Sequence, residues 1–282
     1  MLFRARQFEI RFPRPTIVVG IVNVTPDSFS DGGKFLDRGA AVAHALELVA
    51  QGAEILDIGG ESTRPGAQPV DEKEELRRVI PVIEELAAKT GVALSIDTTK
   101  PGVARAALVA GASIVNDIAG GREDAGIWRC VAEFSAGYIA MHALGQPHAM
   151  PATPAYDEVV REVGEFFARR LDQLAAAGVS PSQVVLDPGI GFGKAPRHNL
   201  QLLANLDEFS GCGRPLLVGV SRKSFIGKIS GANLNERLPA SLACATLAVE
   251  SGVQFIRAHD VKETIQAVRM AEAILSQKND VA

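Results

Sequence analysis

The segment ALSIDTTKPGVARAALVAGASIVN, residues 93–116, decides the fold class. An apolar run that ends at Ile96 is followed by a polar turn, and small apolar residues then recur at helical spacing up to Gly111. A glycine just after a periodic segment is typical of the left-handed residue that ends a helix. A second apolar run, Ser113–Asn116, begins directly afterwards. The order strand, helix, strand predicts two parallel strands joined by a helix that covers the sheet.

The same unit recurs along the chain. The predicted strands are Ile17–Asn23, Glu54–Ile58, Ala93–Ile96, Ser113–Asn116, Tyr138–Met141, Val184–Leu186, Pro215–Val218 and Phe255–Ala258. The predicted helices include Ala40–Ala50, Glu72–Lys89, Val103–Ala110, Asp157–Ala177, Asn199–Phe209, Ala240–Glu250 and Val261–Gln277. Eight strands alternating with helices in 282 residues favour an α/β fold of the (β/α)8 TIM-barrel type. An open, doubly wound sheet is the alternative.

The first residues of the chain show a different pattern, because apolar side chains alternate there at period two. They are Phe3, Ala5, Phe8, Ile10 and Phe12. We expect a small β-hairpin that plugs the N-terminal mouth of the barrel. No Pro-, Gly- or Ser-rich tract divides the chain, so residues 1–282 are interpreted as a single domain.

Composition excludes several classes of function. The net charge of -4 argues against nucleic acid and anionic membrane surfaces as partners, since these require a basic surplus. The three cysteines form no CxxC pair, so neither a zinc site nor a disulfide framework is indicated. No apolar run approaches the roughly 20 residues of a membrane span. We expect a cytoplasmic protein without a membrane partner.

Polar residues occupy nearly every predicted strand end, which is where TIM barrels place their active sites. These residues are Asn23, Asp97, Asn116, Asp117, the pair Met141-His142, Asp187, the triplet Ser221-Arg-Lys223, and the segment Arg257-Ala-His-Asp260. Asp117 and Asp260 could equally be N-caps of the following helices, and Lys223 could be a solvated helix residue. Asp97 and Asp187 do not open helices directly, which favours a place in a pocket.

The glycine-rich segment Gly189-Ile-Gly-Phe-Gly-Lys194 matches no nucleotide-binding motif. A phosphate-binding P-loop would need glycine at Pro188 and serine or threonine at Ala195, and the spacing of a dinucleotide fingerprint also fails. Neither ATP nor NAD is supported. The chain also contains no HExxH motif, and Ser221 lacks the flanking glycine of a nucleophile elbow.

The types of residue at the strand ends indicate the chemistry of the ligand. Buried carboxylates, an amide and an ammonium suit a flat heterocycle that carries N–H donors and a carbonyl. A second group suits a pyrophosphate whose charge is shared by a divalent metal, and it contains Asn23, Arg64, Arg257 and His259. The residues alone therefore predict a site for a heterocycle and a pyrophosphate.

The same segments resemble the dihydropteroate synthase family. Residues 23–33 (NVTPDSFSDGG) and 57–66 (DIGGESTRPG) look like the two signatures of that family. The resemblance continues through SIDT at 95–98, NDI at 116–118, DPGIGFGK at 187–194, GVSRKS at 219–224 and RAHD at 257–260. It covers nearly the whole chain. After His142 many family members have Met-x-Gly where this chain has Ala143-Leu-Gly-Gln-Pro147, so the resemblance is weaker at that rim.

The resemblance implies a transferase that condenses a pterin-methyl pyrophosphate with p-aminobenzoate, and a pocket that sulfonamides also occupy. The implied pterin ligands are Asp97, Asn116, Asp187 and Lys223, with Arg257 stacked on the ring. The implied pyrophosphate ligands are Arg64, Arg257 and His259, with Asn23 near Mg²⁺. The implied p-aminobenzoate pocket contains Thr63, Pro65, Phe192 and Ser221, and Met141 completes the expected substrate-binding set. Asp97, Asp187, Lys223 and Arg257 are the candidate catalytic residues.

The resemblance also implies a homodimer formed through barrel helices. Two other functions remain as alternatives. A pterin-dependent methyltransferase shares the barrel and the acidic pterin site, but it has no use for a Ser-Arg-Lys segment or for the loop after Asn23. A non-catalytic paralogue would be indicated by lost pocket residues, and the sequence retains them all.

Overall fold

Eight parallel strands form a closed barrel. The computed structural model describes residues 1–25, 38–62, 68–118, 125–145 and 154–279. The strands follow the order β8-β7-β6-β5-β4-β3-β10-β9. The first and last of these meet through a parallel bridge between Leu186 and Leu216, and the Leu186 amide donates to the Pro215 carbonyl at 2.9 Å. The bridge closes the sheet, which confirms the predicted TIM barrel and excludes the open alternative.

The elements follow one another as the sequence predicts, with small shifts at their ends. The barrel strands are β3 (Ile17–Asn23), β4 (Ile55–Gly59), β5 (Ala93–Asp97), β6 (Ile114–Asp117), β7 (Gly137–Met141), β8 (Val184–Asp187), β9 (Leu217–Gly219) and β10 (Phe255–Ala258). The helices are α1 (Arg38–Ala50), α2 (Glu72–Lys89), α3 (Pro101–Ala110), α4 (Gly126–Phe134), α5 (Val159–Ala176), α6 (Pro196–Leu203), α7 (Ser224–Ser230), α8 (Leu238–Glu250) and α9 (Val261–Ser276).

Three helical regions differ from the prediction. Helices α4 and α7 were not in the predicted set, and both are short. The helix predicted over Asn199–Phe209 starts earlier, at Pro196, because proline is pre-organised for the first helical position. It also ends at Leu203, and a separate 3₁₀ helix follows over Leu206–Cys212. Short helices of one or two turns carry too few periodic positions to be recognised in sequence.

The side-chain alternation along each strand separates two regions. Leu56 and Ile58 of β4 point outward and pack with the helices, as Leu94 and Ile96 of β5 do. The positions between them point into the barrel. Near the N-terminal ends these inward residues are apolar and form one buried layer: Ile17, Val19, Ile55, Ala93, Ile114, Ile139, Val185, Leu217 and Phe255. Two residues further along several strands, the inward positions become polar.

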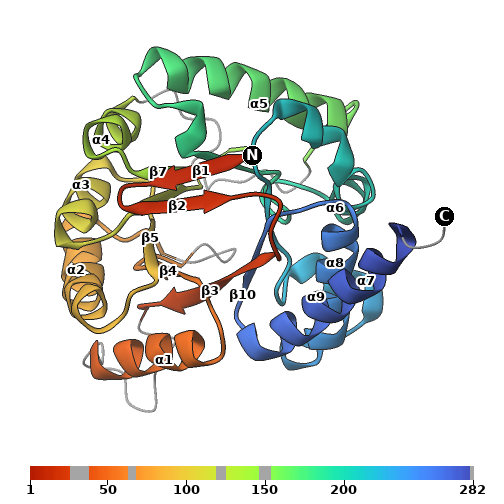
Figure 1. The fold of residues 1–282 in the computed structure, drawn as a ribbon, viewed down its shortest axis with the longest axis horizontal. Coiled ribbons are helices and arrows are strands. Elements are labelled where there is room, and N and C mark those ends of the chain that lie inside the picture. The colour runs from red at the N-terminus through yellow and green to blue at the C-terminus, as the bar shows by residue number, and fades with distance from the viewer. Residues whose placement is uncertain (26–37, 63–67, 119–124, 146–153, 280–282) are drawn as a thin grey trace.

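The N-terminal hairpin covers the apolar end of the barrel, as predicted. Strands β1 (Leu2–Ala5) and β2 (Phe8–Arg11) pair in antiparallel fashion and lie across the barrel in the view of Figure 1. Phe3 and Ala5 are buried against the inward apolar layer. The ring of Phe3 meets that of Phe255 edge-on, with centroids 5.7 Å apart. The hairpin therefore closes the end opposite to the carboxyl ends of the strands.

A single arginine joins the hairpin to the helical layer. Arg6 lies in the turn between β1 and β2 and has a positive φ of 55°. Its guanidinium donates to the Leu108 carbonyl at 2.7 Å and to the Ala112 carbonyl at 2.8 Å, at the C-terminal end of α3. These carbonyls lie at a helix end, where intrahelical partners run out, so the cation both satisfies them and fixes the hairpin.

The packing under the hairpin can be tested by removing one methylene group. Ile17 is fully buried in the apolar layer, so Ile17→Val should lower the free energy of unfolding by about 0.5–1.5 kcal/mol. Chemical denaturation followed by circular dichroism measures this change. Val109, which is 72% exposed on α3, provides the control: Val109→Ala should change stability by less than about 0.5 kcal/mol. An unchanged stability in Ile17→Val would contradict a tightly packed floor.

Candidate active site

The polar layer inside the barrel is organised around Asp57, which is fully buried in the middle of β4. Its Oδ2 atom accepts from Asn116 Nδ2 at 2.9 Å and from Arg257 Nε at 2.6 Å. The Nη2 atom of the same arginine donates to Asp97 Oδ2 at 2.9 Å. One guanidinium thus bridges two carboxylates from neighbouring strands. Charge-assisted bonds of this kind hold side chains in a defined orientation.

Several buried oxygens in this layer have no hydrogen-bond partner among the described residues. They include Asp57 Oδ1, Asn116 Oδ1 and the hydroxyl of Ser95. An unsatisfied buried polar group costs about 1–3 kcal/mol, so native proteins keep few of them. Their concentration on three adjacent strands indicates a surface built to receive a polar ligand or water.

Asp97 lies at the end of β5, at the rim of this layer. Burial raises the pKa of its carboxyl from 3.8 to about 7, and the neighbouring carboxylate of Asp57 adds to the rise, while Arg257 opposes it. A strongly perturbed carboxyl in the mouth of a barrel is typical of a functional site. The carboxyl is therefore poised to change its protonation near neutral pH.

This pKa shift predicts the pH dependence of stability. Because the folded state binds the Asp97 proton more tightly than the unfolded state, the stabilising effect of protonation is lost as pH rises from about 4 to about 7. The melting temperature of wild type relative to Asp97→Asn should therefore fall by at least about 2 °C between pH 5 and pH 8. Calorimetry of both proteins measures this. A difference that stays constant or grows with pH would contradict the raised pKa.

The opposite side of the mouth contains Asp187 and Lys223. Asp187 ends β8 and accepts from the Gly189 amide at 2.7 Å, and burial raises the pKa of its carboxyl. Lys223 directly precedes α7, and its Nζ atom lies 4.2 Å from the centroid of the Phe192 ring. Burial lowers the pKa of Lys223 to about 8, and the cation Arg257 acts in the same direction. The mouth therefore combines two acidic groups with an ammonium.

Phe192 belongs to a small apolar group at the rim. It packs with Ile118, Met141 and Ala143, at the carboxyl ends of β6 and β7. This group contains the predicted substrate-binding residue Met141. It also contains Ala143, the first position of the segment that departs from the family pattern. An apolar rim beside the polar layer suits a ligand with one polar and one aromatic part.

Ser221 and His259 form a hydrogen-bonded pair at the ends of β9 and β10. The Ser221 hydroxyl accepts from the His259 backbone amide at 3.2 Å and lies 3.0 Å from the Nδ1 atom of the same histidine. The hydroxyl proton is therefore available to donate to Nδ1. Burial, followed by Arg257, lowers the pKa of His259 to about 3, so the ring is neutral. We assign the proton to Nε2, which leaves that atom as a donor.

The structure thus brings together most of the residues predicted from the sequence. Asp97, Asn116 and Arg257 meet in one hydrogen-bonded network, Lys223 faces Phe192, and Ser221 pairs with His259. Asn23 ends β3 and is in register with Gly59 of β4. Thr63, Arg64 and Pro65 lie outside the described residues.

The two aspartates that could be helix caps differ in their positions. Asp117 accepts from the Tyr138 hydroxyl at 2.8 Å, and the next helix among the described residues begins at Gly126. Asp260 is the N-cap residue of α9, and its carbonyl accepts from the Thr264 amide at 3.0 Å. Its side chain makes no capping hydrogen bond and instead accepts from Arg222 Nε at 2.9 Å. Lys223 is partly buried at the start of α7, so it is not a solvated helix residue.

Sequence reasoning missed Asp57 as a member of the site. The predicted site contained residues at strand ends, and Asp57 lies in the middle of the strand Ile55–Gly59. A charged residue inside a buried apolar run was the available signal, since carboxylates are almost never fully buried unless they are paired.

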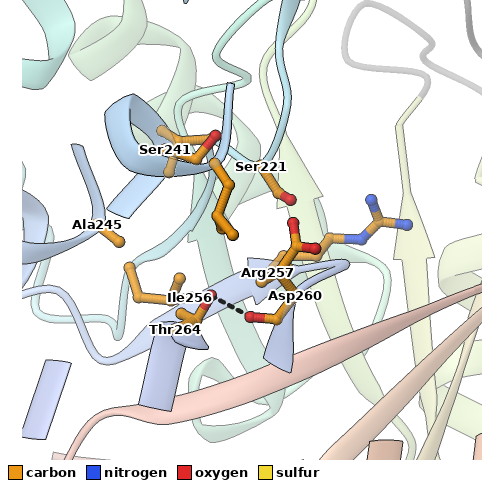
Figure 2. Close-up of a pocket in the computed structure, with 10 residues that line it drawn as sticks. Ser221, Ser241, Ala245, Ile256, Arg257, Asp260 and Thr264 are labelled. Carbon is orange, nitrogen blue, oxygen red and sulfur yellow. Dashed lines mark hydrogen bonds between the residues drawn. The ribbon is translucent and has the colours of Figure 1, made fainter. Parts of the chain in front are cut away.

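A small pocket lies behind the barrel wall, between α8 and α9. Figure 2 shows Ser241, Ala245 and Thr264 around it, with the Thr264 hydroxyl donating to the Asp260 carbonyl at 2.7 Å. The guanidinium of Arg257 points away from this pocket, toward the barrel interior where Asp57 and Asp97 accept from it. Ser221 and Arg257 also line the pocket, so it adjoins the site at the ends of β9 and β10.

The residues at the barrel mouth can be tested for their fit to a metal ion. Within the described ranges, no group of three or more His, Cys, Asp or Glu side chains is arranged to hold a metal ion. Mg²⁺ does not require such a group, because it commonly keeps several waters and takes one or two protein oxygens together with substrate phosphates. The amide of Asn23 at the end of β3 supplies an oxygen donor of the kind that Mg²⁺ accepts.

Comparison with known proteins agrees with this geometry. Residues 19–259 match the family described as pterin binding enzyme. The dihydropteroate synthase of Escherichia coli K12 is 48% identical over 263 residues, which cover 93% of each chain. The Yersinia pestis dihydropteroate synthase, solved in a sulfonamide drug complex, superimposes with a TM-score of 0.91 at 44% identity, covering 98% of this chain and 100% of that one. The Xanthomonas albilineans enzyme with 4-aminobenzoic acid gives 0.90 at 44% identity, covering 97% and 98%.

The barrel, its polar mouth and the family match define a pterin-binding enzyme. The relatives named above are matched over almost their full length, so they identify the family within this class. The chain belongs to the dihydropteroate synthases, which are transferases of folate synthesis.

Proposed function

We propose that the barrel mouth of this chain condenses 6-hydroxymethyl-7,8-dihydropterin pyrophosphate with p-aminobenzoate, giving 7,8-dihydropteroate and pyrophosphate. The observation that carries the proposal is the bridge from Arg257 to Asp57 and Asp97 beside the unpartnered oxygen of Asn116. This arrangement offers acceptors and a planar cation within one barrel, which are the groups that a pterin requires. We propose in addition that residues 1–282 form a single pterin-binding domain.

The pterin lies in the polar layer. Asp187 and Asn116 present oxygens to its N–H donors, Asp97 contributes a carboxyl at the rim, and Lys223 donates to a ring nitrogen or carbonyl oxygen. Arg257 provides a guanidinium plane on which the ring can stack. The support is that four of these residues lie in the last two positions of barrel strands, namely Asp97, Asn116, Asp187 and Arg257. Lys223 follows β9 in the segment that leads to α7 and faces Phe192.

The pyrophosphate lies nearer the ends of β3 and β10. His259 donates through Nε2, Arg257 and Arg64 contribute positive charge, and Asn23 contributes an oxygen to Mg²⁺. When bound, the metal neutralises charge that develops on the departing pyrophosphate. The tautomer that we assign to His259 supports this role, because Nδ1 is engaged with Ser221 and the neutral ring keeps Nε2 as a donor.

The reaction breaks the C–O bond between the pterin methylene and the pyrophosphate, and forms a C–N bond to p-aminobenzoate. With SN1 character, charge leaves with the pyrophosphate before the aniline nitrogen attacks and then releases one proton. Thr63, Pro65, Phe192 and Ser221 hold the aminobenzoate, and Met141 completes the apolar rim. Such a step needs charge stabilisation and alignment more than a strong base.

A steady-state assay of pyrophosphate release tests the proposed function. Release should require both the pterin pyrophosphate and p-aminobenzoate, with one dihydropteroate formed for each pyrophosphate. A methyltransferase and a non-catalytic paralogue would both release no pyrophosphate when the two substrates are present. That result would contradict the proposal.

We also propose a homodimer formed through the helices that follow the last strands. Large apolar side chains are exposed on α8 and α9, with Leu247 at 58%, Met270 at 62% and Ile274 at 61%. Exposed apolar groups on neighbouring helices are typical of subunit interfaces. Sedimentation equilibrium measures the mass directly, and Met270→Lys should shift it toward that of the monomer. A monomeric wild type would contradict the dimer.

The proposed location is the cytoplasm. All three cysteines carry free thiols, and a reducing compartment keeps them so. Among the helices of the described ranges, none is long and apolar enough to cross a membrane. Fractionation of cells that express the protein tests the location, and recovery outside the cytoplasm would contradict it.

A further inference from the structure

The glycine-rich segment after β8 ends in Lys194, a lysine that the proposed reaction does not use. Its side chain is almost completely buried, with 8% of the residue exposed. The Nζ atom lies 3.0 Å from the Gly189 carbonyl oxygen and 3.1 Å from that of Phe192. It also lies 3.2 Å from the His142 carbonyl oxygen and 2.9 Å from His142 Nδ1. One ammonium therefore faces four acceptors from two separate segments.

Burial lowers the pKa of Lys194 to about 7, although the charge of Asp187 opposes this shift, so the four contacts offset only part of the cost of burying the ammonium. An ammonium has three protons and no acceptor, so it can donate to three of these four atoms at a time, or share a proton between two. His142 Nδ1 can only accept from it, and burial, followed by the charge of Lys194, lowers the pKa of His142 to about 3. The histidine is accordingly neutral.

The glycines of the segment allow the close approach. Gly189 has a φ of 67°, and a Cβ atom there would lie 1.8 Å from the His142 carbonyl oxygen. Gly193 has a φ of 60°, and its Cβ would lie 2.5 Å from the Leu144 carbonyl oxygen. The backbone of the loop thus packs directly on the segment that follows β7. Any side chain at either glycine would separate the two and break the contacts of Lys194.

Two site residues depend on this loop. The amide of Gly189 donates to Asp187 at 2.7 Å, and the amide of Phe192 donates to the Gly189 carbonyl at 3.0 Å. Lys194 holds the carbonyl oxygens of the same two loop residues, and the Phe192 ring faces the Lys223 ammonium. The position of an aromatic wall and the orientation of a carboxylate therefore follow from where the loop is fixed.

We propose that Lys194 is a positioning residue, whose ammonium fixes the loop Gly189–Lys194 to the end of β7 and thereby places Phe192 and Asp187 for the reaction. The inference rests on the proposed function. It also explains why this glycine-rich, lysine-ending segment resembles a phosphate loop without being one. Its lysine binds carbonyl oxygens of its own loop and of His142, so it has no proton left for a pyrophosphate.

The test compares Lys194→Met with a control variant that removes a cation at the other end of the barrel. Arg6 is also a cation that binds two backbone carbonyls, so Arg6→Met should cost stability without reaching the mouth. In Lys194→Met the KM for p-aminobenzoate should rise at least about tenfold, because small displacements of a positioning contact are costly. The KM for the pterin pyrophosphate should rise less, since Asp97 and Asn116 keep their contacts. Arg6→Met should leave both KM values within about twofold.

A second variant, Lys194→Gln, keeps one neutral donor and covers the case in which the methionine variant does not fold. Its KM for p-aminobenzoate should lie between those of wild type and Lys194→Met, and calorimetric titration of p-aminobenzoate in pyrophosphate and Mg²⁺ should show the same order. A lower melting temperature with an unchanged KM for p-aminobenzoate in either variant would overturn the inference. Inactive wild type would instead contradict the proposed function.

Discussion

Replacing Lys223 with alanine should reduce kcat by about 10²- to 10³-fold, the usual loss when a group that stabilises charge in the transition state is removed. Its ammonium lies against the Phe192 ring, and burial, followed by the cation Arg257, lowers its pKa to about 8. It is therefore the one ammonium among the described residues of this rim that is left for the pterin. Steady-state kinetics of pyrophosphate release measures the loss.

The same change should leave the melting temperature almost unaffected or slightly raised. Lys223 makes no capping hydrogen bond at the start of α7. Its lowered pKa also means that folding disfavours the charged form, so the native state pays a small cost to keep an ammonium there. Lys228, exposed on the same helix, is the matched control, and Lys228→Ala should change neither quantity. A large loss of stability with a modest loss of rate would show that Lys223 is structural.

The second large effect is expected for Asp187→Asn, which should weaken pterin binding by about 2–4 kcal/mol. The Gly189 amide donates to one carboxylate oxygen of Asp187 at 2.7 Å. In the variant the amide oxygen must occupy that place, so the new Nδ2 atom faces the pterin. A donor then meets the amino edge of the ring, and two donors without an acceptor are left in a buried site.

Isothermal titration with the pterin pyrophosphate measures this loss. Asp207→Asn, at an exposed position of the 3₁₀ helix Leu206–Cys212, makes the same chemical change away from the site and should bind as wild type does. Since burial raises the pKa of Asp187, removing its charge should not destabilise the fold. Wild-type pterin affinity in a folded Asp187→Asn protein would refute the assigned role.

Elements with explicit end signals were predictable to the residue. Helix α2 runs over Glu72–Lys89, the range predicted from the sequence. Asp71 caps it by accepting from the Glu74 amide at 2.7 Å, and acidic residues fill its first turn. Helix α4 has no side-chain cap and begins at a glycine, so nothing in the sequence marked it. The ends of a helix can be predicted from sequence only where capping residues or a terminating glycine mark them.

The site was predictable to a similar degree. Strand ends could be read because parallel strands in a barrel must present their carboxyl ends on one side. The partners of each side chain could not be read, because the bonds of Asp57 join residues 59 and 200 positions apart. Lys194 was visible only as the end of an incomplete motif. Its acceptors become apparent once β7 and β8 lie side by side.

A crystal structure of the protein soaked with a pterin is the most direct test of the central claim, that the polar layer of the barrel mouth is a pterin site. We expect the ring between the carboxyl ends of β5, β6 and β8, with its N–H donors within hydrogen-bonding distance of Asp187 and Asn116 and with the Arg257 guanidinium against its face. A pterin bound elsewhere, such as in the small pocket between α8 and α9, or no bound pterin at saturating concentration, would contradict it.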